Sequence, residues 1–321
     1  MPERRTGNGP AAEAAVSAFA RAKINLYLHV LGRRADGYHD LDSLVVFAGT
    51  GDRIEAAPAG DLSLTVTGPF AAAVPVGEDN LVLRAARALA AATGVAAGAA
   101  IRLDKHLPAA SGMGGGSADA AATIRTLSRL WRVELSKQAA MGLALGLGAD
   151  VPICLAGRPA YLGGIGEAIE PAPMLPPAWL ILANPLQAAS TPRVFAARQG
   201  AYSQAGRFAD APADAGDLAR LLAGRRNDLT AAATSLVPAV GSVIAALQRL
   251  PGALIARMSG SGATAFALFA EAEAARQAAR RLAAEQPNWW VAAAPLLREA
   301  ADTQDGEKGG GAWTSIISGA T

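Results

Sequence analysis

The segment LPAASGMGGGSADAAATIRTLSRLW at residues 107–131 decides how the chain folds, because it places a run of glycines directly before a helical pattern. Apolar residues recur there at the three- and four-residue spacing of an amphipathic helix, at Ala120, Ile124, Leu127 and Trp131. Ser117 is expected to cap the N-terminus of this helix. A flexible linker would continue polar and without a period, so the glycine run is predicted to be a turn between a strand and a helix.

A glycine turn before a helix is well suited to holding an anion. The first backbone N–H groups of a helix have no partner and carry partial positive charge, and glycines let a phosphate approach the backbone closely. The spacing is not that of the common P-loop, G-x-x-x-x-G-K-[ST], and no lysine or arginine follows before Arg125. From these residues alone, a purely structural turn remains an alternative.

Alternating apolar residues predict strands on the N-terminal side of this turn. One strand is expected to start at Ala18, and a second follows the turn DGYH at residues 36–39. Shorter alternating segments at residues 52–59 and 62–68 add further strands, and residues 100–103 lead into the glycine run.

Helices are predicted where the apolar spacing is helical and both ends are marked. The first, at residues 78–94, is opened by Asp79 or Asn80 and closed by Gly94. Further helices are expected at residues 136–147, around 215–223 and 236–249, and at 271–285. Just before the last of them, MSGSGATAFALF at residues 258–269 predicts a glycine turn between two strands.

A proline-rich segment divides the chain. IEPAPMLPPAWLILANP at residues 169–185 indicates a crossing between domains, with the boundary near residue 172 and a strand from Trp179. The expected organisation is a disordered lead-in at 1–17, an N-terminal domain at 18–171, a C-terminal domain at 172–298 and a tail at 299–321.

Composition narrows the class of protein. The 321 residues are 51% hydrophobic and 17% charged, enough for a substantial core, and a net charge of +2 argues against nucleic-acid binding. No segment reads as a signal peptide or a membrane span, so a soluble cytoplasmic protein is expected. Cys154, the single cysteine, is expected to be a buried structural thiol in a reducing compartment. His29 and His106 lack metal-site spacing and are expected to be structural.

Two charged residues are candidates for a site, and each has a structural alternative. Lys23 lies in an alternating apolar strand and is expected to project into an enclosed space. An edge-strand lysine that limits aggregation would give the same pattern. Asp150, in GLGADVP, follows a helix and could equally cap a turn.

Aromatic residues suggest a second part of the site. Tyr38 and His39 follow a glycine turn, where an aromatic ring and a neutral imidazole could hold a planar ring. A structural role fits this pair when it is taken alone, and Phe195 in ASTPRVFAA would by default belong to the core.

Four segments taken in order resemble the GHMP kinase superfamily, which includes galactokinase and the homoserine, mevalonate and phosphomevalonate kinases. They are AKINLYLHVLGRRADGYHDLDS (22–43), LPAASGMGGGSADAA (107–121), GADVP (148–152) and MSGSGATAFALF (258–269). The first is similar to the branch that phosphorylates 4-diphosphocytidyl-2-C-methyl-D-erythritol in the non-mevalonate route to isoprenoids. The resemblance covers about residues 19–295 and implies an α+β fold of two domains, the first like domain 2 of ribosomal protein S5 and the second ferredoxin-like.

The resemblance also implies the residues of the site. Lys23 and Asp150 match the catalytic pair, and Asn25 matches a substrate contact. The central loop would hold the ATP phosphates through Pro108, Gly112, Gly114, Gly115, Gly116 and Ser117. The cytosine would lie between Tyr38 and Phe195 and bond to His39. Substrate would further meet the third motif, at Gly260, Ser261 and Gly262.

The implied reaction is phosphoryl transfer from ATP to the 2-hydroxyl of the cytidine substrate. Asp150 would accept the hydroxyl proton and Lys23 would be its charge partner. Mg²⁺ would accompany ATP, with Ser117 as a candidate ligand. Beyond the small-molecule substrate, neither nucleic acid nor membrane is expected as a partner, and the chain is expected to be a monomer or a homodimer.

Two other functions stay open from the sequence. One is a GHMP kinase for another small alcohol, of the homoserine or mevalonate type, against which the segment GYHDL argues. The other is a silent nucleotide-binding protein, which the joint presence of Lys23 and Asp150 disfavours.

Overall fold

The computed structural model describes residues 15–96 and 98–298. Most of the expected lead-in and the whole expected tail, residues 299–321, lie outside the described residues. Residues 16 and 17 belong to the first strand rather than to the lead-in, because Val16 pairs with Ala56. No helix within the described ranges is long and apolar enough to cross a membrane.

The N-terminal half contains two very long strands, followed by helices and shorter strands. Its elements are β1 (Val16–Arg33), β2 (His39–Ala59), β3 (Leu62–Thr67), the 3-10 helix η1 (Ala71–Ala73), α1 (Leu81–Thr93), β4 (Gly98–Asp104), α2 (Gly115–Trp131), α3 (Lys137–Leu147), α4 (Val151–Ala156), β5 (Ala160–Gly164) and β6 (Ala168–Pro171).

The C-terminal half alternates short strands and helices. Its elements are β7 (Trp179–Asn184), α5 (Thr191–Ala197), α6 (Ala215–Ala223), α7 (Thr230–Leu236), α8 (Ala239–Gln248), β8 (Ile255–Met258), β9 (Ala265–Phe269), α9 (Ala272–Glu285) and β10 (Trp290–Leu297).

The strands form one ten-stranded sheet in the order β3-β4-β2-β10-β7-β9-β8, in which β1 and β5 also pair with β2 and β6 pairs with β5. All of these pairs are antiparallel except β3 with β4. β2 is the hub of the N-terminal half, and the segment at residues 52–59, expected as a separate strand, is its second part. β10 joins the halves, because it pairs along β7 and meets β2 at Leu296 and Leu297.

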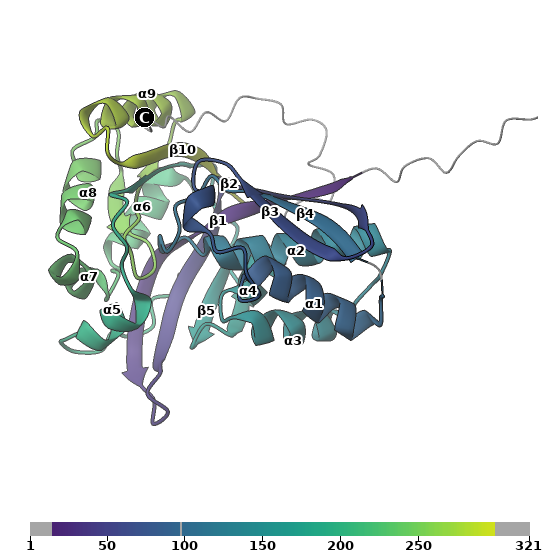
Figure 1. The fold of residues 1–321 in the computed structure, drawn as a ribbon. Coiled ribbons are helices and arrows are strands. Elements are labelled where there is room, and N and C mark those ends of the chain that lie inside the picture. The colour runs from purple at the N-terminus through teal and green to yellow at the C-terminus, as the bar shows by residue number, and fades with distance from the viewer. Residues whose placement is uncertain (1–14, 97, 299–321) are drawn as a thin grey trace, which may run out of the picture.

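Three apolar layers, and a smaller cluster that joins β1 to α5 and α7, hold these elements together. α1 and α2 pack on the N-terminal strands around Phe47 and Leu127, and α8 and α9 pack on the C-terminal strands around Phe269 and Leu282. A central layer lies between the halves and contains residues of β1, β2, β7, β9 and β10. Figure 1 shows α1, α2 and α3 on one side of the long β1 and β2 strands and α8 and α9 on the other. Each fully buried leucine or phenylalanine in such a layer contributes about 1.5–3 kcal/mol relative to exposure.

The helix after the glycine run starts earlier than predicted. Ser117 is not its N-cap, because the helix begins at Gly115 and Gly114 occupies the cap position with a φ of 63°. Glycine adopts this left-handed conformation without steric cost, so the chain turns into the helix sooner. Ser117 therefore lies within the first turn.

The other predicted helices are close to those observed. α1 is capped by Asn80, whose side chain accepts from Val82 N at 2.8 Å, and it ends at Gly94 as expected. The short helices α4, α5 and α7 were not predicted. α4 begins directly after Asp150, at the place where the sequence indicated only a turn.

Candidate active site

The glycine loop and the turn between β8 and β9 lie in direct contact. A Cβ atom added to Gly112 would lie 2.5 Å from Gly262 O and 2.8 Å from Ser259 O. Thr264 N also donates to Ser111 O at 3.1 Å. Two of the segments singled out in the sequence therefore form one surface, and only glycine fits at position 112.

Ser259 joins these two loops to β1. Its hydroxyl accepts from Asn25 N at 3.1 Å and donates to Gly112 O at 3.3 Å. The sequence pointed to residues 260–262 and missed Ser259, whose position before the first glycine of the turn was the available signal. Its contact with a residue 234 positions away could not be read from the sequence.

Lys23 and Asp150 form an ion pair beside the glycine loop. Lys23 Nζ lies 3.0 Å from Asp150 Oδ2, and the two side chains are 6% and 39% exposed. Lys23 is thus buried, and the alternative of a solvent-facing lysine that limits aggregation does not apply, although β1 pairs along its length only with β2. Asp150 makes no capping bond to α4, so its carboxylate is directed to Lys23 and to solvent.

The loop and Asn25 fix the position of the Lys23 ammonium. Lys23 Nζ donates to Asn25 Oδ1 at 3.1 Å, and Asn25 Nδ2 donates to Ser43 Oγ at 2.8 Å. A Cβ atom on Gly114 would lie 3.1 Å from Lys23 Cε and 3.8 Å from Asp150 Oδ2. The ion pair and the turn into α2 are therefore packed against each other.

The remaining predicted phosphate-loop residues lie at the start of α2. Ala118 N donates to Gly114 O, which closes the first turn, so the N–H groups before Ala118 lack partners within the helix. Gly116 is exposed and Ser117 is half-buried, whereas Pro108, at the start of the loop, is buried. This end of α2 presents backbone donors and the Ser117 hydroxyl beside the ion pair.

A buried cluster of Lys105, Asp52 and Asp119 packs beside the entry to the glycine loop, and the sequence analysis did not predict it. Lys105 Nζ lies 2.6 Å from both Asp52 Oδ2 and Asp119 Oδ2. Asp52 Oδ1 also accepts from the backbone N of His106 at 2.6 Å and of Leu107 at 2.8 Å. Burial and the second carboxylate raise the pKa of Asp119 well above its usual range, against the effect of Lys105. The cluster ties β2 and α2 to the residues that enter the loop.

The predicted base-binding residues meet only in part. The rings of His39 and Phe195 are stacked, with centroids 5.3 Å apart and planes 28° apart. Tyr38, which was expected to face Phe195, is 60% exposed and lies outside this stack. Partial burial, together with the nearby Arg33 and Arg198, lowers the pKa of His39 below its ordinary value.

The third motif connects these aromatic residues to the loop. Gly260 has a φ of 56°, and a Cβ atom there would lie 2.9 Å from Gly112 O and 3.4 Å from Asn25 Oδ1. Ser261 Oγ lies 2.7 Å from the hydroxyl of Thr191, the first residue of the helix that carries Phe195. Residues 260–262 therefore lie between the ion pair and α5.

Other candidates from the sequence are structural. His29 is buried, and its ring nitrogens contact Gln204 O at 2.8 Å and Arg226 N at 3.2 Å. His106 pairs with Asp104, and complete burial raises the pKa of the Cys154 thiol to about 12. Within residues 15–96 and 98–298, no group of three or more His, Cys, Asp or Glu side chains could hold a metal ion.

The arrangement can hold a polyanion next to a carboxylate. Free helix N–H groups and the Lys23 ammonium attract negative charge, and Asp150 can accept a proton from a hydroxyl group brought to its open side. Asp150 is suited to accepting a proton because one side of its carboxylate is paired with Lys23 and the other side is open to a substrate.

Comparisons with known proteins identify the family of the chain. The sequence matches the "GHMP kinases N terminal domain" over residues 80–158 and "GHMP kinases C terminal" over residues 208–288. It is 58% identical over 278 residues to a 4-diphosphocytidyl-2-C-methyl-D-erythritol kinase of Paramagnetospirillum magneticum, covering 87% of this chain and 97% of that protein.

Solved structures agree with these matches. The crystal structure of a 4-(cytidine 5'-diphospho)-2C-methyl-D-erythritol kinase superposes with a TM-score of 0.71 at 35% identity, covering 87% of this chain and 98% of that one. A homoserine kinase from Cytophaga hutchinsonii superposes at 0.69 with 18% identity, covering 92% and 98%, which shows the fold alone. The expected α+β GHMP kinase fold is confirmed, while the domain boundary near residue 172 stays a prediction.

Proposed function

Since the chain belongs to the 4-diphosphocytidyl-2-C-methyl-D-erythritol kinase family of GHMP kinases, we propose that it transfers the γ-phosphoryl group of ATP to the 2-hydroxyl of that cytidine compound, a step of isoprenoid biosynthesis. The observation that carries the proposal is the Lys23–Asp150 ion pair at 3.0 Å, packed against the glycine loop. Phosphoryl transfer needs an aligned hydroxyl, a proton acceptor and neutralised phosphate charge.

Asp150 is the proposed proton acceptor. Its carboxylate is accessible, and Lys23 stabilises its negative charge at 3.0 Å. The same ammonium stabilises charge that develops on the transferred group. Asn25 holds Lys23 in place, and Ser259 in turn holds the Asn25 backbone. These contacts orient the reacting groups before substrate arrives.

The start of α2 is the proposed phosphate site. The backbone N–H groups before Ala118 have no partner within the helix and are the proposed phosphate donors. Gly112, Gly114 and Gly115 let this turn pack closely on residues 259–262, Lys23 and Lys105, and the buried Lys105 cluster ties the loop entry to β2 and α2. The Ser117 hydroxyl, half-buried in the first helical turn, fits a magnesium ion that arrives with ATP. When bound, Mg²⁺ neutralises phosphate charge.

The aromatic group is the proposed cytosine site. His39 offers a neutral ring for hydrogen bonds, because its pKa is lowered. Phe195 supplies a stacking face, and the exposed Tyr38 is free to close over the base as a second face. Gly260, Ser261 and Gly262 lie between this group and the ion pair, where the rest of the substrate would run.

The test measures ADP release by the purified chain with MgATP, comparing 4-diphosphocytidyl-2-C-methyl-D-erythritol with homoserine and mevalonate. We expect turnover with the cytidine compound only. Turnover with another alcohol instead would keep the kinase and overturn the cytosine site. ATP binding without substrate-dependent ADP release would establish a silent nucleotide-binding protein.

A further inference from the structure

A stretch of chain after α5 is held in place by side chains instead of by secondary structure. We call residues 203–208 the clamp segment; it lies within residues 198–214, which contain no helix or strand. Its backbone bonds to β1 in two places: Ser203 N donates to Val30 O at 2.9 Å, and Gln204 O lies 2.8 Å from His29 Nδ1. Phe208 N donates to Tyr161 Oη of β5 at 2.9 Å. Arg225 Nε donates to Gly206 O at 2.7 Å.

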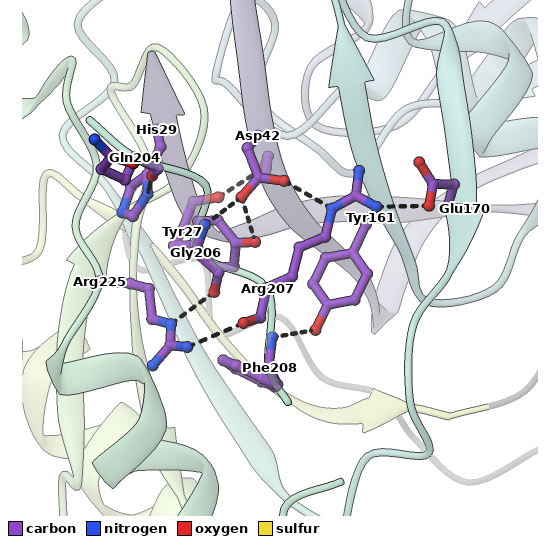
Figure 2. A network of polar contacts seen from close by, with 11 residues as sticks. Tyr27, His29, Asp42, Tyr161, Glu170, Gln204, Gly206, Arg207, Phe208 and Arg225 are labelled. Carbon is purple, nitrogen blue, oxygen red and sulfur yellow. Dashed lines mark hydrogen bonds and ion pairs between the residues drawn. The ribbon is translucent and has the colours of Figure 1, made fainter. Parts of the chain in front are cut away.

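Asp42 of β2 is the centre of these contacts (Figure 2). Only 2% of Asp42 is exposed, and its carboxylate accepts from Gly206 N at 2.6 Å, Tyr27 Oη at 2.9 Å and Arg207 Nε at 3.1 Å. Burial and the Asp42 charge raise the pKa of Tyr27 far above its usual range, so the phenol stays a donor. Three donors satisfy a carboxylate that would be costly to bury alone.

Gly206 fits this position because it lacks a side chain. A Cβ atom there would lie 2.8 Å from His29 Cε1 and 3.1 Å from Arg225 Cγ. The backbone at Gly206 thus packs directly on the His29 side chain of β1 with no room for a methyl group. This close approach brings Gly206 N within bonding distance of Asp42.

The clamp segment connects the two elements that carry the proposed cytosine site. His39 starts β2, three residues before Asp42, whereas Phe195 is on α5, which leads into the segment. Between them, Arg198 donates to Gly200 O at 2.9 Å and to Ala201 O. A shift of the segment away from β2 would therefore move α5 relative to His39.

We propose that Asp42 is a positioning residue for the cytosine site, which holds the clamp segment on β1 and β2 so that Phe195 stays against His39. This inference rests on the proposed function. The polar partners of Asp42 are Tyr27, Gly206 and Arg207, and neither Lys23 nor Asp150 is among them. Lys23 is held by Asp150, Asn25 and the glycine loop. Loss of the clamp should therefore weaken substrate binding and leave phosphoryl transfer intact.

The test compares Asp42→Asn and Gly206→Ala with the wild-type enzyme. The first substitution removes the charge that holds Arg207, and the second adds a methyl group that pushes the segment away from His29. Asp42→Asn should raise the KM of the cytidine substrate about tenfold, the loss expected for one charged hydrogen bond. Gly206→Ala should raise the same KM through the steric displacement of the segment. The kcat and the KM of ATP should stay within about twofold, the pattern of lost ground-state binding. Glu285→Gln is the control, since Glu285 is the exposed partner of Arg281 on α9 and makes no contact with the clamp segment.

A fall in kcat together with equal rises in the KM values of both substrates would overturn the positioning role. An unchanged KM for the cytidine substrate would also overturn it. If Asp42→Asn does not fold, Arg207→Gln removes one donor from the carboxylate and is measured in the same way. Binding of cytidine 5′-diphosphate by calorimetry separates this proposal from the proposed function. If the wild-type enzyme does not turn over the substrate, the proposed function is wrong. Weaker binding of cytidine 5′-diphosphate by the variants than by the wild-type enzyme would still support the role of Asp42, and equal binding would overturn it.

Discussion

Asp150 is a single residue on which turnover should depend without an effect on nucleotide binding. Asp150→Asn keeps the volume of the side chain but cannot accept a proton, so kcat should fall about 10²–10⁴-fold. ATP affinity should be nearly unchanged, because the proposed phosphate site is the glycine loop and the start of α2 and does not include Asp150. ADP release and calorimetry of ATP binding check both. Asp210→Asn, at an exposed position, is the control, and near-normal turnover of the Asp150 variant would remove the proton-acceptor role.

His39 gives a prediction for pH. Burial first, and then Arg33 and Arg198, lower its pKa from 6.5, so the folded protein takes up this proton at lower pH than the unfolded chain does. The neutral ring therefore persists at neutral pH, and its contribution to stability is lost only as the pH falls below 6.5. An NMR titration should find the His39 midpoint below this value. Arg33→Gln should raise that midpoint, and a midpoint unaffected by the charge would leave burial as the whole cause.

Among individual residues, the sequence predicted the site residues that lie within recognisable motifs and missed the residues that act through tertiary contacts. Lys23, Asp150 and the loop glycines stand in recognisable segments, and the structure brings them together. Asp52 stands outside the quoted motifs, and Asp42 stands inside the first of them with nothing in the pattern to distinguish it from Asp40. A solvated aspartate on a strand would look the same in either place. Only the fold shows that Asp52 meets Lys105, 53 positions away, and that Asp42 meets Gly206, 164 positions away.

The turn into α2 gives a prediction for an element. Gly114→Ala places a side chain in the left-handed region and within 3.1 Å of Lys23 Cε, so it should lower kcat by displacing the ion pair. Gly94→Ala is a matched control. Gly94 has a φ of 70° at the end of α1 and nothing within 4 Å, so this variant should lose only about 1 kcal/mol of stability. Chemical denaturation and steady-state kinetics compare the two, and equal kcat values would contradict the loop's role.

Helix length explains which elements the sequence revealed. α1, α2, α3 and α9 are long enough for the helical period to repeat, and their positions were predicted to within a few residues. α4, α5 and α7 have only six or seven residues, so apolar spacing repeats less than twice in each. Their helical state is set by packing, as with Val194 of α5 in the apolar cluster beside β1.

For the whole molecule, the central apolar layer predicts one unfolding transition. Residues of β1 and β2 share that layer with residues of β7, β9 and β10, so each half exposes one of its two apolar layers when the other half unfolds. Far-UV circular dichroism and tryptophan fluorescence should give coincident curves in urea, with Trp131 in the first half and Trp290 in the second. Two separate transitions would show that the layer does not couple the halves.

The contact of Asn25 with Ser259 also has a consequence for synthesis. The first strand carries Lys23, the proposed charge partner of the proton acceptor, but the Ser259 hydroxyl that bonds to the nearby Asn25 is translated 234 residues after Asn25. At about 5–20 residues per second, a ribosome needs over ten seconds to cover that distance. In the later part of this interval, after Asp150 has been translated, the nascent chain has Lys23, the glycine loop and Asp150 but lacks Ser259. A growing chain should therefore consume no ATP until its last quarter has emerged.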